Sequence, residues 1–336
     1  MAKTVGAAFV KFCSDFVDLE ETQVTKARAS RDAMIERING LSNFFPLYSQ
    51  QHMQFGSFAR KTKIRPIDDI DLIISMSGGD LVIADERSWS DIRLKLKNMQ
   101  SFFKPFCDST NYNPYSGQGT WYLNSNKVKN KFKSALEALH DCRKAELHSN
   151  QEAVTLQFSS YCWNFDIVPA FYVESNAERY YLIPNGQGGW KKTNPKKDRE
   201  NVAATNTRTR GEALKLIRLV KYWNKRRTMP SMPSYALETL VINFCNSKAI
   251  YENTRLNFQN FLFYLHQNVG YPIQDPKGIQ GNINTLNLSQ MHAIRQRAMT
   301  DYRNALDASN YEAKGQHGLA INIWRKVFGN DFPAYG

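Results

Sequence analysis

Residues 54–76 read QFGSFARKTKIRPIDDIDLIISM, and this stretch decides the fold. Phe55-Gly56-Ser57 is followed, twelve residues after the serine, by Asp69-Ile70-Asp71-Leu72. On a β-strand, residues two apart project from the same face, so Asp69 and Asp71 lie side by side while their apolar neighbours face a core. Two adjacent carboxylates on a buried strand repel each other, and a bound cation compensates for that repulsion.

A third acidic residue occurs in another strand-like run, Asn164-Phe165-Asp166-Ile167-Val168-Pro169, where Asp166 is the lone acid. Carboxylate oxygens are hard ligands that suit Mg²⁺ or Mn²⁺, and substrate phosphates usually complete the octahedron. Three aspartates on adjacent strands fit a site for two ions, of which one activates a hydroxyl and the other stabilises the leaving pyrophosphate. An Asp-x-Asp pair by itself also occurs on solvent-facing edge strands and at calcium-type surface sites.

The Gly-Ser pair makes the catalytic interpretation more specific. Gly56 lets the backbone approach a phosphate closely, because it has no side chain. Ser57 and the neighbouring amides can donate hydrogen bonds to phosphate oxygens. Asp68 adjoins the acidic pair, but strand alternation directs it away, and we interpret it as a turn residue.

The rest of the chain predicts a mixed first half and a helical second half. One long amphipathic helix is expected over residues 5–39, another helix over 126–147, and strands over 52–55, 69–76, 153–158, 163–168 and 180–183. Further helices are expected over residues 207–227, 234–248, 256–267, 286–306 and 311–328. The sequence therefore predicts an α+β fold, with a mixed-sheet domain over 1–200, a helical lobe over 201–336 and a hinge at the turn-rich residues 184–189.

Composition excludes several classes of protein. With 336 residues, 42% of them hydrophobic, the chain can bury a substantial core. No run of about 18 uncharged apolar residues occurs, so no membrane span is expected. The first residues lack the apolar core of a secretion signal. The five cysteines are scattered and odd in number, which is typical of free thiols in a reducing compartment and predicts a cytoplasmic protein.

The chain is basic, with a formal net charge of +13. Much of that excess lies in residues 190–227, which contain 13 Lys and Arg against 3 Asp and Glu. A basic stretch of this kind indicates polyanionic partners such as nucleotides or nucleic acid, although it also occurs on ordinary solvated surfaces.

The Gly-Ser, gap, Asp-hydrophobic-Asp pattern resembles the DNA polymerase β-like nucleotidyltransferase superfamily. The segment from Gly56 to Ile64 before the acids is similar to the cGAS/DncV-like nucleotidyltransferases (CD-NTases) of bacterial anti-phage systems. LIRLVKYW at residues 216–223 and PSYALE at residues 233–238 are similar to oligoadenylate synthetases and their bacterial relatives. The resemblance extends with clear motifs from about residue 54 to residue 238.

This resemblance implies a polymerase β-like palm with a mixed sheet and a C-terminal oligoadenylate synthetase-like helical lobe. It implies that Asp69, Asp71 and Asp166 bind two Mg²⁺ or Mn²⁺ ions, and that Asp166 also promotes deprotonation of the acceptor hydroxyl. The nucleotide-binding residues that it implies are Gly56, Ser57, Lys221, Ser234 and Tyr235. Of these, Ser57 and Lys221 would contact the triphosphate, and Tyr235 would stack on the base. From the residues alone, Lys221 is also compatible with a solvated lysine, and Tyr235 is also compatible with a core aromatic residue.

The activity implied by the resemblance is template-independent nucleotidyl transfer from ATP or related triphosphates, closing a cyclic di- or oligonucleotide. Such a product would act as a second messenger for a downstream effector in anti-phage (CBASS) signalling. One alternative is a linear 2′–5′ oligoadenylate synthetase activated by RNA bound along residues 190–227. Another is a non-catalytic nucleotide or nucleic-acid binder, although the three intact acids argue against it.

Two departures from relatives limit what the resemblance implies. The tight His/Cys cluster of the zinc-binding thumb in animal cGAS is missing, because the nearest set, His140, Cys142 and His148, has poor spacing for zinc. No P-loop motif occurs either.

The chain ends at Gly336, and some family members resemble ubiquitin-like substrates joined to targets by a ligase through a C-terminal residue. An ordinary mobile tail is the simpler interpretation of that segment.

Overall fold

The computed structural model describes residues 1–42, 44–116, 118–139, 142, 145–158, 162–175, 178–227 and 229–336. Its contacts divide the chain into two compact units. The sheet unit comprises Glu21–Ala59 and Ile67–Lys196. The helical unit comprises Met1–Glu20, Arg60–Pro66 and Lys197–Gly336. The sequence instead assigns all of residues 1–200 to the sheet domain. The two divisions therefore differ mainly at residues 1–20 and 60–66, which belong to the helical unit.

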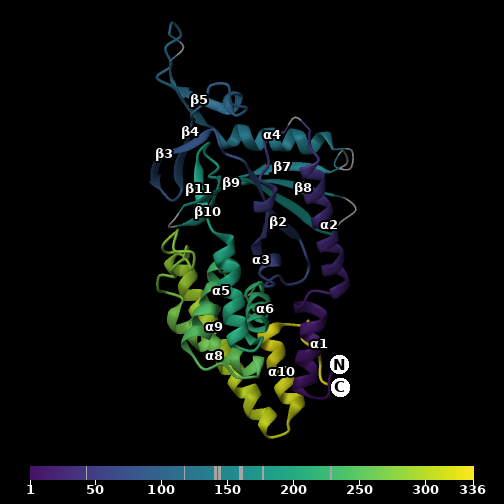
Figure 1. Ribbon diagram of the computed structural model, residues 1–336. Coiled ribbons are helices and arrows are strands. Elements are labelled where there is room, and N and C mark those ends of the chain that lie inside the picture. Colours follow the sequence, from purple (N-terminus) through teal and green to yellow (C-terminus); the bar gives the residue numbers. More distant parts are fainter. Residues whose placement is uncertain are drawn as a thin grey trace. The chain divides into compact units, whose positions relative to one another are not determined.

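A mixed sheet forms the centre of the sheet unit (Figure 1). Its strands are β1 (Met53–Phe55), β2 (Asp69–Met76), β3 (Leu81–Ser88), β4 (Asp91–Leu96), β5 (Cys107–Thr110), β6 (Thr120–Leu123), β7 (Glu146–Asn150), β8 (Ala153–Gln157), β9 (Asn164–Glu174), β10 (Arg179–Pro184) and β11 (Trp190–Thr193). The order is β1-β2-β9-β10-β11-β4-β6-β5, with β3 beside β4, and with β7 beside β8, which pairs with β9. Strands β2 and β9 are parallel, and their other neighbours pair with them antiparallel.

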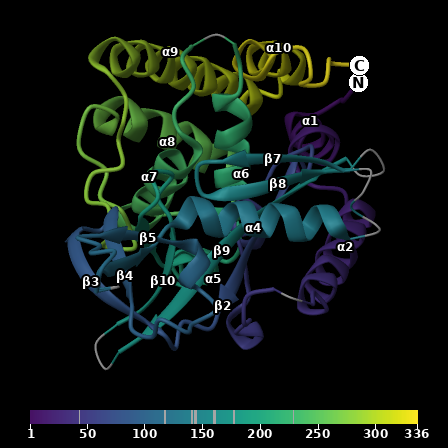
Figure 2. The ribbon, with the colours of Figure 1, turned by 90° about the horizontal axis from the view of Figure 1, so that it is seen from above.

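Helices α2 (Glu21–Asn39), α3 (Gly56–Ala59) and α4 (Ser125–Ala138) complete the sheet unit, together with the 3₁₀ turns η2 (Ser49–Gln51) and η3 (Lys104–Phe106). Figure 2 shows α4 lying along the sheet beside β7 and β8. Aromatic rings join α4 to the sheet: Phe132 stacks on Phe45, and Phe45 stacks on Phe103. Phe103 then meets Phe171 of β9 edge to face at 5.6 Å. This packing defines the covered face of the sheet.

The helical unit contains α1 (Val5–Phe12), the π-helical turn η1 (Cys13–Val17), most of α5 (Pro195–Arg208), α6 (Glu212–Asn224), α7 (Ser234–Ser247), α8 (Thr254–Asn268), α9 (Leu288–Ala313) and α10 (His317–Phe328). Large rings fill its core, and Trp223, Trp324 and Phe258 are all at most 1% exposed. The two ends of the chain meet here, since the Ala2 N–H donates to the Ala334 carbonyl at 2.9 Å. Among the described residues, no helix is both long enough and apolar enough to span a membrane.

The predicted helix over residues 5–39 is wrong, because the chain is interrupted after η1. The Asp18 N–H closes a π-type turn on the Cys13 carbonyl at 2.7 Å, and Asp18 itself is extended. Arg218 donates to the Asp18 carboxylate at 2.6 Å, and Arg65 donates to its carbonyl. The break is stabilised by two arginines from distant segments of the chain, Arg218 and Arg65. The local spacing of apolar residues carries no information about such contacts, so it did not predict the break.

Two other helices were predicted with the wrong bounds. The helix expected over 126–147 stops at Ala138, and residues 146–150 form β7, which pairs with β8 in the register Leu147↔Leu156. The helix expected over 207–227 is two helices, α5 and α6, because Arg210 and Gly211 adopt left-handed conformations between them. In both places a local helical pattern was outweighed by strand pairing or by a turn.

The hinge predicted at residues 184–189 is instead the tight connection of the β10–β11 hairpin, inside the sheet unit. The Asn185 side-chain oxygen accepts hydrogen bonds from the N–H groups of Gln187 and Gly189, at 2.8 and 3.0 Å. Its amide nitrogen donates to the Ser90 carbonyl at 3.0 Å. The glycines therefore serve a braced turn.

The α+β class and the mixed sheet are confirmed. Strand β2 spans the predicted residues 69–76, and β1, β8 and β10 lie within one residue of prediction at each end. Strand β9 is longer than expected. All five cysteines are free thiols, as the composition indicated.

Candidate active site

The strand register places two of the three predicted acids side by side on one face of the sheet. Asp71 of β2 is the direct partner of Asp166 on the parallel strand β9, and Asp69 lies opposite Asn164 one pleat away. Directly paired residues in a sheet project from the same face. Asp71 and Asp166 are therefore neighbours, although 95 positions separate them in the sequence.

Alternating burial along both strands confirms which way these side chains point. Ile70 and Leu72 are 0% exposed, whereas Asp69 and Asp71 are half-buried. Strand β9 repeats the pattern, with Asp166 half-buried between Phe165 and Ile167. Ile167 pairs with Leu72, and Phe171 of the same β9 face lies on the covered side of the sheet. The acids therefore occupy the face opposite α4.

Gly56 fits closely beside Asp71. It has a left-handed backbone, with φ of +71°, at the junction of β1 and α3. A Cβ added to it would lie 1.7 Å from Oδ2 of Asp71. Any larger residue would displace this carboxylate, so the glycine is needed for the acid as well as for the turn. Ser57 follows on the first turn of α3, half-buried.

Sequence reasoning missed Thr155, which binds the third acid. Its hydroxyl donates to Oδ1 of Asp166 at 2.6 Å from the neighbouring strand β8, in the register Thr155↔Asp166. The amide of Asn150 in turn lies 3.4 Å from the Thr155 hydroxyl. The alternation of Ala153-Val154-Thr155-Leu156 places a polar residue on one strand face, but only the register shows that it meets Asp166.

The donor set fits a hard divalent cation, because it consists of carboxylate oxygens. Within the part of the chain that the structure describes, no three His, Cys, Asp or Glu side chains are already gathered as a metal-binding group. The register brings Asp71 and Asp166 together as neighbours. Of the residues weighed for zinc, His140 lies outside the described residues.

Lys221, predicted to contact phosphate, is buried in the helical unit. Its ammonium lies 2.8 Å from Oε1 of Glu238, whose side chain is 3% exposed. Arg60 and Thr62 donate to the other oxygen of that carboxylate at 3.1 and 2.9 Å. Burial raises the pKa of Glu238, but the charges of Arg60 and Lys221 outweigh burial and hold it below its ordinary value.

Tyr235 takes part in a second buried cluster of the helical unit. Its hydroxyl lies 2.6 Å from Asp198 and 2.9 Å from Asp275. Burial and these two carboxylates raise the pKa of Tyr235 far above its ordinary range. The Lys277 ammonium lies 4.3 Å from the ring centroid. Tyr235 is therefore neither a plain core aromatic nor an open surface ring.

Ser234 is the first residue of α7 and is exposed, with Pro233 at the helix N-cap. The nucleotide contacts of Lys221, Ser234 and Tyr235 stay predictions, as do those of Gly56 and Ser57. Gly336 is exposed, and its N–H donates to the Ala2 carbonyl at 3.4 Å.

A mixed sheet with an Asp-x-Asp strand, a third aspartate on the parallel neighbour and a preceding Gly-Ser turn places the fold in the class of nucleotidyltransferases. A family model, the Second Messenger Oligonucleotide or Dinucleotide Synthetase domain, matches residues 3–115. The probable cyclic nucleotide synthase of Bacillus cereus (strain VD146) is 37% identical to the chain, over 100% of the chain and 99% of that protein.

The cyclic AMP-AMP-AMP synthase of Escherichia coli (strain MS 115-1) is 23% identical, and the match covers 96% of each protein. The structure of E. coli MS115-1 CdnC with ATP has the same fold, with a TM-score of 0.69 at 19% identity over 97% of this chain and 98% of that one. The chain belongs to the CD-NTases, a family of cyclic nucleotide synthases, which confirms the resemblance seen in its motifs.

Proposed function

We propose that the protein is a metal-dependent, template-independent nucleotidyltransferase that joins ATP, alone or with other nucleoside triphosphates, into a cyclic di- or oligonucleotide. The observation that carries the proposal is the pairing of Asp71 with Asp166 on parallel strands, with Asp69 on the same face of β2. Like charges directly opposite each other destabilise a sheet, so an acidic pair in this position favours a role with cations.

Each residue around the acids has a role that follows from its contacts. Thr155 donates to Oδ1 of Asp166, and we assign the Asp166 carboxylate to accept the proton of the attacking ribose hydroxyl. Gly56 keeps the Asp71 carboxylate in place by leaving space for it. Asp69, Asp71 and Asp166 would hold two Mg²⁺ or Mn²⁺ ions, which when bound lower the pKa of the attacking hydroxyl and offset negative charge on the triphosphate.

The relatives indicate where to look for substrate and product. The curated match from E. coli MS 115-1 is named a cyclic AMP-AMP-AMP synthase, and CdnC of the same strain was solved with ATP, so ATP is the first substrate to test. We propose that the product is a second messenger for a separate effector in anti-phage (CBASS) signalling, made in the cytoplasm. Attachment of Gly336 to a target by a ligase is a further proposal. It requires that deletion of Gly336 abolish conjugation in cells that contain the ligase.

The RNA-activated alternative loses support from the ion pairs of the basic stretch. Within the sheet unit, Lys191 pairs with Glu152 and Lys192 with Glu86. Within the helical unit, four more basic residues of the stretch 190–227 pair with acids, namely Arg210, Lys215, Arg218 and Lys221. Paired cations present a weaker field to a polyanion than their number suggests.

Product analysis tests the proposed function. Purified protein is incubated with each triphosphate radiolabelled at the α-phosphate, singly and in mixtures, with Mg²⁺ or Mn²⁺. A cyclic product survives phosphatase because it has no terminal phosphate, and mass spectrometry then gives its composition. We expect such a product from the wild type and from the matched control Asp68→Asn, and none from Asp71→Asn or in EDTA.

Other results would change the assignment. A phosphatase-sensitive product that requires RNA would establish the linear 2′–5′ synthetase. The absence of product under every condition would overturn the enzymatic proposal and favour the non-catalytic binder.

A further inference from the structure

Helix α8 has a buried apolar stripe and, beside it, a second stripe of aromatic and amide side chains. The first stripe enters the core of the helical unit and is 0% exposed, and its residues are Phe258, Phe261, Leu262 and Leu265. The second stripe follows the helical spacing i, i+3, i+4, i+7 and is partly or fully exposed; its residues are Asn260, Phe263, Tyr264 and Gln267. A surface helix needs only one buried stripe, so the second is a candidate for ligand binding.

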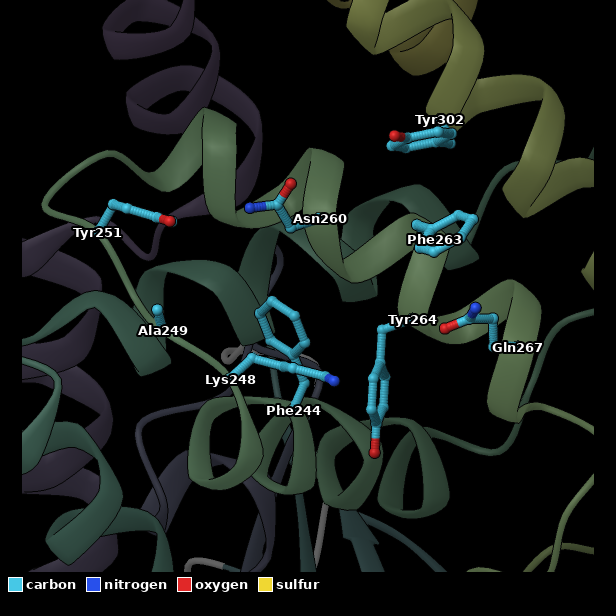
Figure 3. Close-up of a pocket in the computed structure, with 9 residues that line it drawn as sticks. All are labelled: Phe244, Lys248, Ala249, Tyr251, Asn260, Phe263, Tyr264, Gln267 and Tyr302. Carbon is cyan, nitrogen blue, oxygen red and sulfur yellow. The ribbon is translucent and has the colours of Figure 1, made fainter.

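The second stripe forms one wall of a cavity of about 300 Å³ (Figure 3). This volume lies at the small end of the range for small-molecule sites. The remaining lining comes from the end of α7, the segment after it and α9, and consists of Phe244, Lys248, Ala249, Tyr251 and Tyr302. All of these residues belong to the helical unit, so the cavity is contained within one compact unit.

Aromatic rings dominate the cavity. Tyr264 meets Phe244 with ring centroids 5.4 Å apart, and Phe263 meets Tyr302 at 5.1 Å. Figure 3 shows the Tyr264 and Phe263 rings projecting from the same helix toward the cavity. Phe263 is 38% exposed although its ring contacts Tyr302, so part of the ring is open to contact with a ligand. Rings of this kind stack on planar heteroaromatic groups without strong preference for one base.

The polar lining favours an anion attached to that planar group. Among the nine lining residues, one is a lysine and none is acidic. The ammonium group of Lys248 projects toward Tyr264 in Figure 3. The side-chain amides of Asn260 and Gln267 each offer both donors and an acceptor, which are the groups that recognise the edge of a purine.

We propose that this cavity is a second nucleotide site, which binds a purine nucleotide with its base among the rings and its phosphate at Lys248. None of its lining residues belongs to the nucleotide-binding or catalytic set predicted for synthesis. The site would therefore sense nucleotide rather than react with it. ATP and a cyclic oligoadenylate share the required chemistry, and the experiment below distinguishes them.

Lys248 also has a simpler role. It is the C-cap residue of α7, where its positive charge stabilises the helix by interacting with the negative end of the helix dipole. Lys314 occupies the same position on α9, is exposed and does not line the cavity. Lys314→Ala is therefore a matched control for Lys248→Ala. Ala249→Trp provides an independent test, since the added ring would fill the cavity from its exposed wall.

The experiment is equilibrium dialysis on the full chain carrying Asp69→Asn and Asp71→Asn, in EDTA, which suppresses metal-dependent binding at the acids. The probes are radiolabelled ATP, a synthetic cyclic oligoadenylate, adenosine and inorganic triphosphate. Because ATP binding is measured without synthesis, the test is independent of the proposed function. Thermal unfolding of each variant confirms that it is folded.

We expect saturable binding of ATP, of the cyclic oligoadenylate or of both, with adenosine and triphosphate each much weaker. Lys248→Ala should weaken that binding about tenfold, as expected for loss of a charge-assisted contact, and Ala249→Trp should abolish it. Lys314→Ala should leave it unchanged. Binding of ATP alone identifies a substrate sensor, and binding of the cyclic compound alone identifies a product sensor. No saturable binding, or binding that folded Ala249→Trp and Lys248→Ala variants retain, would overturn the proposal.

Discussion

Two regions of the molecule surround their carboxylates with opposite kinds of neighbour. In the helical unit, Glu238 is 3% exposed and is surrounded by Lys221, Arg60 and Thr62. In the sheet unit, the residue directly opposite Asp71 is another acid, Asp166. Removing one member of a buried ion pair is strongly destabilising, whereas like charges opposite each other on strands are themselves destabilising. We infer that the first cluster maintains the fold, and we propose that the second binds cations.

The largest expected effect separates activity from stability. Asp71→Asn should lower turnover on the order of 10³-fold, because a predicted metal ligand is lost. The same change removes the repulsion with Asp166, so the free energy of unfolding should stay level or rise by about 0.5 kcal/mol. Steady-state pyrophosphate release and urea unfolding measure the two quantities. A parallel loss of both would show that Asp71 is structural.

The reverse pattern is expected in the helical unit. Glu238→Gln leaves Lys221 and Arg60 buried without their counter-charge, and should destabilise the protein by about 3 kcal/mol. Glu252→Gln, which removes an exposed ion pair with Arg210, is the matched control and should change stability by less than about 0.5 kcal/mol. Equal effects of the two variants in urea unfolding would contradict the proposed difference between the regions.

Gly56→Ala should disturb the acids through shape alone. The new Cβ would overlap Oδ2 of Asp71, and the left-handed backbone would be strained. We expect turnover to fall about 100-fold and stability to fall by about 1–2 kcal/mol. Gly6→Ala, in the open space around α1, is the control and should leave both quantities close to wild type. Full activity in Gly56→Ala would refute the close packing of this glycine on the acid.

Thr155→Val tests the positioning of Asp166 with little change in shape. Loss of the donated hydrogen bond should lower turnover about tenfold, because the Asp166 carboxylate is no longer held in position. Thr155→Ser keeps the hydroxyl and should restore the rate. A serine variant as impaired as the valine variant would indicate that the methyl group, rather than the hydrogen bond, matters.

The smallest effect is a pH dependence of stability. The pKa of Glu238 is lowered from its ordinary value of 4.5, so its ion pairs stabilise the folded state above that pH and are lost as the pH falls below it. The stability difference between wild type and Glu238→Gln should therefore shrink in acid. Urea unfolding across the range from about pH 3 to pH 7 measures this difference. A constant gap would exclude Glu238 as the titrating group.

The sequence predicted the elements whose patterns are local. Strand β2 was placed correctly because its acids alternate with buried aliphatic residues. The exposed hairpin of β3 and β4 was missed, since residues 81–88 are largely solvent-facing and contain bulges that disrupt alternation. The break at Asp18 depends on Arg65 and Arg218, which lie far away in the chain.

The site was predicted in part for the same reason. The strand patterns and the resemblance proposed Asp69, Asp71 and Asp166 as site residues, and the register places Asp166 beside Asp71. Thr155 was not predicted, because a threonine on a strand has no distinguishing pattern until its partner strand is known. The ion pair of Lys221 with Glu238 was likewise hidden, although both residues lie within the motifs that resemble oligoadenylate synthetases.

The most direct measurement is Mn²⁺ binding, followed by electron paramagnetic resonance in the presence of a non-hydrolysable ATP analogue. We predict two bound ions per chain in the wild type and in Asp68→Asn, and an affinity at least about tenfold weaker in Asp71→Asn and Asp166→Asn. Equal Mn²⁺ binding by all four proteins would contradict the assignment of these strand aspartates as the metal ligands.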